Sequence, residues 1–366
     1  MLGWINSSQT LESILIYRTG SFGDHIVGLP CLHLVAKQFP SHRRILLTNH
    51  PSNEKAPSVA SIFEGSGLID EIIYRPLVPR KNPLEMVSLS RKIRGTKVST
   101  LIYLPAGPEH RRFRIHRDLL FFYLCGITTF FGLPDKNEMD RLRLPSGKWE
   151  HECSRLARML IGLGEINLSS RANWDLRLLK EETAWAKQQI SCLESNKFLT
   201  ISISSTIQAK DWPQTRWQAL VPMLRRAFPT HGLIAVGAEQ DRESSQAVLS
   251  HWDGPSLNLC GNALPRQTAA VFAYSDIFFG LDSGPMHLAA SLGIPCVVVF
   301  AARTLPGIWF PFGAGHEVLY RETSCSNCRL DLCIQEQQRC LTSISTDEVL
   351  EAALRIRNRG LRNDHS

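Results

Sequence analysis

Residues 279–295 of the chain, FGLDSGPMHLAASLGIP, combine a strand, a tight turn and a helix in one short segment. The apolar run that ends at Asp282 predicts a buried strand, and Ser283 and Gly284 form a small-residue turn after it. Pro285 stands where a first helical residue is tolerated. The free backbone N–H groups at the start of such a helix suit a phosphate group, although an ordinary β–α turn also needs small residues.

A second glycine-bordered turn lies near the start of the chain. The strand-like run 13–18 is followed by Thr-Gly-Ser-Phe-Gly-Asp, which ends at Asp24. A helical pattern follows over residues 25–39, with Pro30 expected to kink it, and another strand is predicted at 44–48. Because both halves of the chain contain such a turn, we expect an α/β protein with two Rossmann-like domains, each giving one loop to a central cleft.

Length and composition agree with this organisation. The chain has 366 residues, 43% hydrophobic and 20% charged, as expected of a globular protein with about two domains. We expect an N-terminal domain over 1–175, a linker over 176–195, a C-terminal domain over 196–344, and a C-terminal helix and tail over 345–366 that packs back across the domains. The first residues lack the pattern of a secretory signal, and no uncharged run reaches the ~20 residues of a membrane span. We therefore expect a cytoplasmic protein.

Positive charge is concentrated in the N-terminal half. The formal net charge is +7, and arginine and lysine cluster in the segments 75–97 and 109–117. A solvated basic face would explain this pattern, and so would a docking surface for an anionic acceptor or for an anionic membrane. Nucleic acid is not expected as a partner, because no recognised nucleic-acid-binding motif accompanies the charge.

Several polar residues of the C-terminal half suit a nucleoside diphosphate. Ser205 and Thr206 follow a predicted strand at 198–203, and Lys210 comes shortly after them. Hydroxyl groups followed by a lysine can clamp an anion through hydrogen bonds and charge. The next predicted strand is followed by Glu239, whose carboxylate could hold ribose hydroxyls or cap the following helix.

Together these segments resemble glycosyltransferase family 9, the heptosyltransferases of lipopolysaccharide inner-core assembly. The resemblance rests on residues 16–24, 210–217, 237–239 and 282–290, which occur in the family's order and span nearly the whole chain. It implies a GT-B fold, with the acceptor on the N-terminal domain and the nucleotide-sugar donor on the C-terminal domain. The implied donor is ADP-heptose, and the implied acceptor is an anionic lipid-linked sugar at the inner face of the cytoplasmic membrane.

The resemblance also implies roles for single residues. Asp24 takes the place of the general base that deprotonates the acceptor hydroxyl, which attacks the anomeric carbon with inversion as ADP leaves; capping of the next helix is an alternative role. The implied donor-binding residues are Ser205, Thr206, Lys210, Glu239, Asp282, Ser283, Gly284 and His287, although a core position would equally explain His287. The expected acceptor-binding residues are Arg18, Arg111, Arg112 and Arg114. No metal or cofactor is expected to be required.

Two features stand outside this pattern. Residues 301–304 are Ala-Ala-Arg-Thr, where the family more often has a Gly-Pro-Thr turn. The sequence therefore does not predict the conformation of this loop. Four cysteines crowd into one segment: Cys325, Cys328, Cys333 and Cys340. They could hold a structural zinc, but their spacing lacks the paired motifs of a zinc ribbon, and reduced thiols or a disulfide are the alternatives.

Three functions remain open from the sequence. The first is transfer of heptose from ADP-heptose, and the second is a related transfer with another nucleotide sugar or a non-lipopolysaccharide acceptor. The third is nucleotide binding without transfer, against which the presence of both Asp24 and Lys210 argues. A nicotinamide oxidoreductase is disfavoured, because the first loop has only Gly20 and Gly23 of a Gly-x-Gly-x-x-Gly motif.

Overall fold

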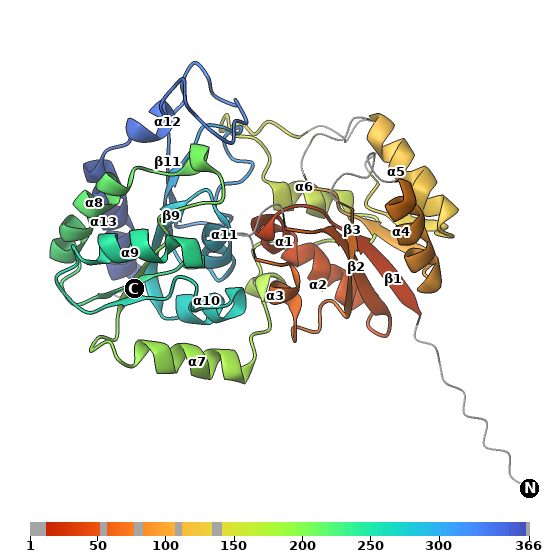
Figure 1. Ribbon diagram of the computed structural model, residues 1–366, viewed down its shortest axis with the longest axis horizontal. Helices are drawn as coiled ribbons and strands as arrows, with labels where there is room; N and C mark the ends of the chain where they lie inside the picture. Colours follow the sequence, from red (N-terminus) through yellow and green to blue (C-terminus); the bar gives the residue numbers. More distant parts are fainter. Residues whose placement is uncertain (1–11, 52–56, 77–82, 107–111, 134–140, 364–366) are drawn as a thin grey trace, which may run out of the picture.

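The chain forms two α/β domains that lie side by side (Figure 1). The computed structural model describes residues 12–51, 57–76, 83–106, 112–133 and 141–363. Each domain is built on one parallel sheet with helices on both faces, which confirms the predicted fold class. In the described ranges no helix is both long enough and apolar enough to cross a membrane.

The N-terminal domain has a five-stranded sheet in the order β3-β2-β1-β4-β5, with all neighbours parallel. Its strands are β1 (Ser13–Tyr17), β2 (Arg43–Asn49), β3 (Glu71–Arg75), β4 (Thr100–Tyr103) and β5 (Thr129–Phe131). One face packs on α1 (Phe22–Val27), α2 (Leu29–Gln38), α3 (Ala60–Phe63) and α6 (Glu152–Met159), and the other on α4 (Pro83–Gly95) and α5 (Arg112–Leu124). The interruption expected at Pro30 is the break between α1 and α2 at Gly28.

The C-terminal domain has a six-stranded parallel sheet in the order β11-β10-β9-β6-β7-β8. Its strands are β6 (Phe198–Ile201), β7 (Gly232–Ala235), β8 (Ser256–Asn258), β9 (Ser275–Leu281), β10 (Cys296–Phe300) and β11 (Glu317–Tyr320). Helices α10 (Pro265–Phe272) and α11 (Gly284–Ser291) cover the face toward the N-terminal domain, and α8 (Gln214–Ala227), α9 (Arg242–Leu249) and α13 (Thr346–Asn363) cover the other. Helix α7 (Lys180–Ile190) packs on α10, and the short elements are η1 (Arg171–Trp174), η2 (Gln208–Lys210), η3 (Glu239–Asp241) and α12 (Arg339–Thr342).

The C-terminal helix α13 stays within the C-terminal domain. Its apolar residues Val349, Ala352 and Ile356 belong to the same buried cluster as Leu220 and Leu224 of α8. The expectation that this helix packs back across the domains is therefore wrong. The reason is that its apolar stripe matches the outer face of the second sheet and is buried there.

Helices α1 and α11 join the two domains. A Cβ atom at Gly284 would lie 2.3 Å from the ring of Phe22, so only glycine lets α11 approach α1 this closely. Phe22 and Ile26 also share one buried cluster with Met286 and Leu288. The hydrophobic core is thus continuous from one domain into the other.

Arg266 of α10 makes a second connection between the domains. Its side chain is buried and donates to the main-chain oxygens of Ile62 (3.0 Å), Leu176 (2.8 Å) and Arg177 (2.8 Å). It also forms an ion pair with Glu182 of α7, with an N–O distance of 2.6 Å. One guanidinium therefore fastens the second domain to α3 of the first and to the connecting segment.

The order of the strands in each sheet predicts where a ligand binds. In open α/β sheets, ligands bind beyond the carboxyl ends of the strands where the strand order reverses. That point lies between β1 and β4 in the first sheet and between β6 and β9 in the second. Because α1 follows β1 and α11 follows β9, the packing of α1 on α11 brings the two points together.

Candidate functional site

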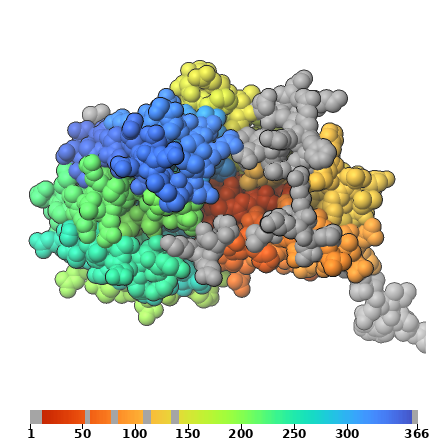
Figure 2. All heavy atoms as spheres, turned by 45° about the horizontal axis from the view of Figure 1, so that its top comes forward, coloured from red at the N-terminus to blue at the C-terminus, as the bar shows by residue number. Residues whose placement is uncertain are grey.

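A cavity of about 270 Å³ lies where the two domains meet. Loops after strands β6, β7 and β9 of the C-terminal domain form most of its wall, and the start of α1 closes it from the N-terminal domain. Its lining includes Ser204, Ser205, Thr206, Gly237, Ala238, Asp241, Ser283, Gly284, Ser21 and Phe22. In the space-filling view the red part of the N-terminal domain borders the blue and green C-terminal domain (Figure 2).

Two of the predicted phosphate-binding segments meet in this cavity. Ser205 and Thr206 come from the loop after β6, and Ser283 and Gly284 open helix α11. The N–H of Ser205 donates to the carboxylate of Asp211 (2.7 Å), which shapes the loop. The hydroxyl of Ser205 donates to the main-chain oxygen of Ile207 (2.7 Å), so the free donors for an anion are the main-chain N–H groups at the start of α11.

Lys210 and Asp282 form an ion pair beside the cavity. The ammonium Nζ lies 2.9 Å from Oδ2 of Asp282 and donates to the main-chain oxygen of the same residue at 3.1 Å. Neither residue lines the cavity itself. The structure therefore holds the lysine charge next to the phosphate-binding segments, with Asp282 as its partner.

The cysteine-rich segment 323–341 supports the turn that carries Lys210. The side-chain amide of Gln338 donates to the main-chain oxygens of Gln208 (2.6 Å) and Asp211 (2.9 Å). Gln338 itself has a left-handed backbone conformation, with φ of 54°. These two bonds hold both ends of the short helix η2, so the position of Lys210 depends on this segment.

Arg303 fixes the same segment from the other side. Its guanidinium donates to the main-chain oxygens of Arg329 (2.9 Å) and Leu330 (2.8 Å), and it pairs with Asp331 at 2.7 Å. The main-chain oxygen of Asp331 accepts the N–H of Ala209, at 3.1 Å. The substitution that departs from the family's usual turn therefore has a structural role in this chain.

The cysteines do not form a metal site in this structure. In the part of the chain that is described, no group of three or more His, Cys, Asp or Glu side chains could hold a metal ion. All four predicted thiols lie within that part and are partly exposed: Cys325, Cys328, Cys333 and Cys340.

Like Lys210 and Asp282, the predicted donor ligands Glu239 and His287 do not line the cavity. The carboxylate of Glu239 is exposed and makes two 2.9 Å hydrogen bonds with Arg242, while Asp241 lines the cavity in its place. His287 is buried and packs edge-on against Trp309. Burial lowers the pKa of His287 to about 3, so the ring is neutral and belongs to the core.

Asp24 lies in the first turn of α1, next to the cavity-lining Ser21. Its Oδ2 accepts the N–H and the hydroxyl of Ser21, both at 2.6 Å, so Asp24 does cap its helix. Gly20 has φ of 135°, and a Cβ there would lie 2.5 Å from the Asp24 side chain. Burial raises the pKa of Asp24, and Arg18 and Ser21 offset this only in part. The carboxylate is therefore more basic than an ordinary aspartate, which suits a general base.

Arg18 lies in the interior, not on an acceptor surface. It is 1% exposed, and its guanidinium donates to the main-chain oxygens of Asp24 (3.1 Å) and Leu104 (3.1 Å). The prediction that Arg18 binds the acceptor does not fit this position, because its buried guanidinium is already hydrogen-bonded to the main chain of the Asp24 turn. Of the other predicted acceptor ligands, Arg111 and the side chains of Arg112 and Arg114 lie outside the described residues.

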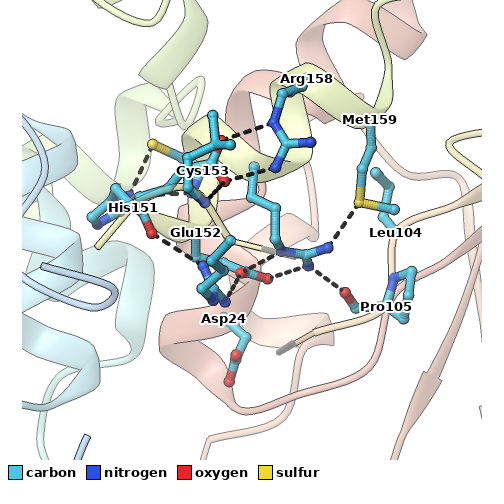
Figure 3. Close-up of polar contacts among 12 residues, drawn as sticks. Asp24, Leu104, Pro105, His151, Glu152, Cys153, Arg158 and Met159 are labelled. Atoms are coloured by element: carbon cyan, nitrogen blue, oxygen red, sulfur yellow. Dashed lines mark hydrogen bonds and ion pairs between the residues drawn. The ribbon is translucent and has the colours of Figure 1, made fainter. Parts of the chain in front are cut away.

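A buried ionic cluster lies beside the Asp24 turn (Figure 3). Glu152 is fully buried, receives hydrogen bonds from Arg155 (2.8 and 2.9 Å) and Arg141, and has Arg18 at 3.9 Å. Burial alone would raise the pKa of Glu152, but these arginines hold it well below its ordinary value. The cluster ties α6 to the loop after β1. It was not predicted, since charges in such a helical segment usually mark a solvated face.

The fold and the site define a protein of the GT-B class, with two Rossmann-like domains and a phosphate-suited cavity at their junction. The chain belongs to glycosyltransferase family 9, the heptosyltransferase family, whose sequence model matches residues 139–338.

Individual relatives agree with this membership. The lipooligosaccharide heptosyltransferase 2 of Campylobacter jejuni is 26% identical over 142 residues, which are 37% of this chain and 43% of the relative. The chain thus aligns with less than half the length of that relative. A family 9 glycosyltransferase structure from Veillonella parvula has a TM-score of 0.69 at 20% identity, covering 94% of this chain and 97% of the other. The structure of E. coli ADP-heptose lps heptosyltransferase II has a TM-score of 0.64 at 16% identity, covering 97% and 100%.

The ionic cluster leads to a prediction about stability. We expect Glu152→Gln to lower the free energy of unfolding by about 3–5 kcal/mol at pH 7, because buried arginines lose their counter-charge. Urea unfolding measures this loss. The exposed Glu181→Gln should change the same quantity by less than about 0.5 kcal/mol.

The pH dependence of the same measurement identifies the cause. A glutamate whose folded pKa is depressed stabilises the fold above its ordinary pKa of 4.5, and this stability is lost as the pH falls below that value. The difference in free energy of unfolding between wild type and Glu152→Gln should therefore shrink by about 2 kcal/mol when the pH is lowered from 7 to 3. A difference that stays constant with pH would mean that packing, not charge, causes the loss.

Proposed function

We propose that this chain is an inverting glycosyltransferase that moves heptose from ADP-heptose to an anionic, lipid-linked core oligosaccharide, without a metal ion. The observation that carries the proposal is a single cavity lined both by the loops proposed to bind the diphosphate and by a residue bonded to the proposed base. Anion-binding loops of the C-terminal domain form its wall, and Ser21, which is hydrogen-bonded to Asp24, lines it from the N-terminal domain.

The donor is proposed to bind with its diphosphate between the loop after β6 and the start of α11. Ser205, Thr206, Ser283 and Gly284 line the cavity there. Thr206 and the start of α11 would supply donors to phosphate oxygens, and the Ser205 hydroxyl would join them by giving up the main-chain oxygen of Ile207. Lys210 neutralises the departing charge once the diphosphate replaces Asp282 as its partner. The membership of the heptosyltransferase family and the name of the E. coli relative support ADP-heptose as the donor.

The ribose is proposed to lie near the loop after β7. Asp241 lines the cavity in that loop, and Glu239 stands at its rim in an ion pair with Arg242. Each oxygen of the Glu239 carboxylate keeps a lone pair that can accept a ribose hydroxyl while it pairs with Arg242, but Glu239 does not line the cavity, whereas Asp241 does. Asp241 is therefore the second candidate for this contact.

Asp24 is proposed to act as the general base. Its Oδ2 is held by Ser21, and its Oδ1 has no hydrogen-bond partner among the described residues, which leaves it to accept the proton of the acceptor hydroxyl. The acceptor oxygen then attacks the anomeric carbon as the bond from that carbon to the diphosphate breaks on the opposite side. A single displacement of this kind inverts the configuration at the anomeric carbon.

The acceptor is proposed to be an anionic glycolipid at the inner face of the cytoplasmic membrane, with the protein itself cytoplasmic and nucleic acid playing no part. The basic segments of the N-terminal half support an anionic acceptor. The Campylobacter relative supports it too, since its name places it in lipooligosaccharide assembly.

Nucleotide selectivity tests the proposed donor. We expect calorimetric titration in the presence of EDTA to show binding of ADP, with UDP, GDP and NAD bound at least about tenfold more weakly, because the family's donor carries adenine. A preference for UDP or GDP would contradict heptose transfer from ADP-heptose. Loss of ADP binding in EDTA would contradict metal independence.

Substitution of Asp24 tests the proposed base. Asp24→Asn keeps an oxygen that can accept the bonds from Ser21 but cannot take up a proton at neutral pH. We expect kcat for transfer to fall by about 10²–10⁴-fold, with the Kd for ADP changed less than about threefold. If ADP affinity fell in parallel with kcat, Asp24 would be a structural residue of the loop.

A third test concerns Lys210 and its support. We expect Lys210→Ala to raise the Kd for ADP by about tenfold or more, because it removes a charge-assisted contact to phosphate. Gln338→Ala should raise the same Kd by a smaller factor of about three, since it loosens η2 without removing the charge. Gln337→Ala is the matched control, because Gln337 also has positive φ (45°) but is not bonded to η2 through its side chain. Unchanged ADP affinity in Lys210→Ala would contradict the phosphate assignment.

A further inference from the structure

Helices α4 and α5 form an outer layer of the N-terminal domain with exposed apolar side chains. Leu84 and Val87 of α4 and Leu120, Tyr123 and Leu124 of α5 are between 48% and 79% exposed. Large apolar side chains that gather on one surface usually mark an interaction site, whereas single ones are common on any protein.

These five side chains lie on one side of the domain. Both helices cover the same face of the sheet, with Leu89 and Ile93 of α4 and Phe122 of α5 buried against it. The guanidinium of Arg94 donates to the main-chain oxygen of Leu124 at 3.1 Å, so the ends of the two helices touch. Figure 1 shows the pair at the edge of the molecule away from the C-terminal domain.

The same layer is positively charged. Arg91, Lys92 and Lys97 are exposed and make no ion pair within the described residues. The acidic residues of the two helices are Glu85 and Asp118, and Asp118 is paired with Arg117 at 2.6 Å. The layer therefore combines exposed apolar groups with cations that are not neutralised.

We propose that the α4–α5 layer docks on an anionic lipid bilayer. Leucine and tyrosine side chains of a surface helix insert at the boundary between headgroups and acyl chains, and lysine and arginine beside them meet the lipid phosphates. The positive charge of the layer complements an anionic lipid surface. A second copy of the chain fits less well, because its α4–α5 layer carries the same positive charge.

The inference rests on the proposed function in one respect: docking through this layer holds at the bilayer the N-terminal domain, which is proposed to receive the glycolipid acceptor. Vesicle binding itself requires neither donor nor acceptor. A failure of the docking proposal is therefore distinguishable from a failure of the proposed reaction.

The experiment is sedimentation of the purified full chain with vesicles of phosphatidylcholine alone or with phosphatidylglycerol. We expect the phosphatidylglycerol vesicles to bind the protein more tightly, and Leu120→Ser/Tyr123→Ser to weaken that binding by about tenfold. Arg91→Gln/Lys92→Gln should weaken it by a similar factor of about ten and reduce its salt dependence. Ile161→Ser/Leu264→Ser is the matched control, because these residues are 58% and 63% exposed but lie outside the layer.

Three results would overturn the proposal. The first is an absence of binding to vesicles of either composition, and the second is equal loss of binding in the control pair. The third is a wild type that binds no lipid and is a dimer in light scattering, together with a Leu120→Ser/Tyr123→Ser variant that is a monomer. That result would show that a second copy of the chain covers the layer. Circular dichroism melting of each variant confirms that the substitutions leave the fold intact.

Discussion

The contact between the starts of α1 and α11 is the constraint on which the rest of the structure depends. Two sheets of the Rossmann type each offer a ligand-binding edge, but neither edge alone encloses a donor and an acceptor. The ring of Phe22 against the backbone of Gly284 brings these edges within one cavity. The same contact merges the two hydrophobic cores, so the geometry of the site and the stability of the molecule have a common origin.

The β–α turns were predictable because they depend on local chemistry. Small residues before a helix start, proline in its first turn and apolar strands on either side are visible in any sequence, and they located Ser283, Gly284, Ser205, Thr206 and Asp24. Alternation of such units along the chain was sufficient for the fold class. The capping role of Asp24 was equally visible, since a carboxylate three residues after a serine is a common start of a helix.

What could not be predicted depends on contacts between distant segments. Arg18 is buried because Gly28 leaves room for its side chain and Glu152, far along the chain, supplies its counter-charge. The ion pair between Lys210 and Asp282 joins two loops that are adjacent only in the folded sheet. Helix α13 shows the same limit, because an apolar stripe reports that a helix is buried but not which surface buries it.

Arg266 has a consequence for how the molecule moves. Its guanidinium holds the main-chain oxygen of Ile62 across the domain boundary, and it also holds two main-chain oxygens and the Glu182 carboxylate of the connecting segment. To separate the domains at this point, a buried charged group would have to give up the oxygen of Ile62, and that lost hydrogen bond carries a free-energy cost. The boundary therefore resists opening at this point. Together with the buried cluster that the two domains share, this contact couples loosening of one domain to the other.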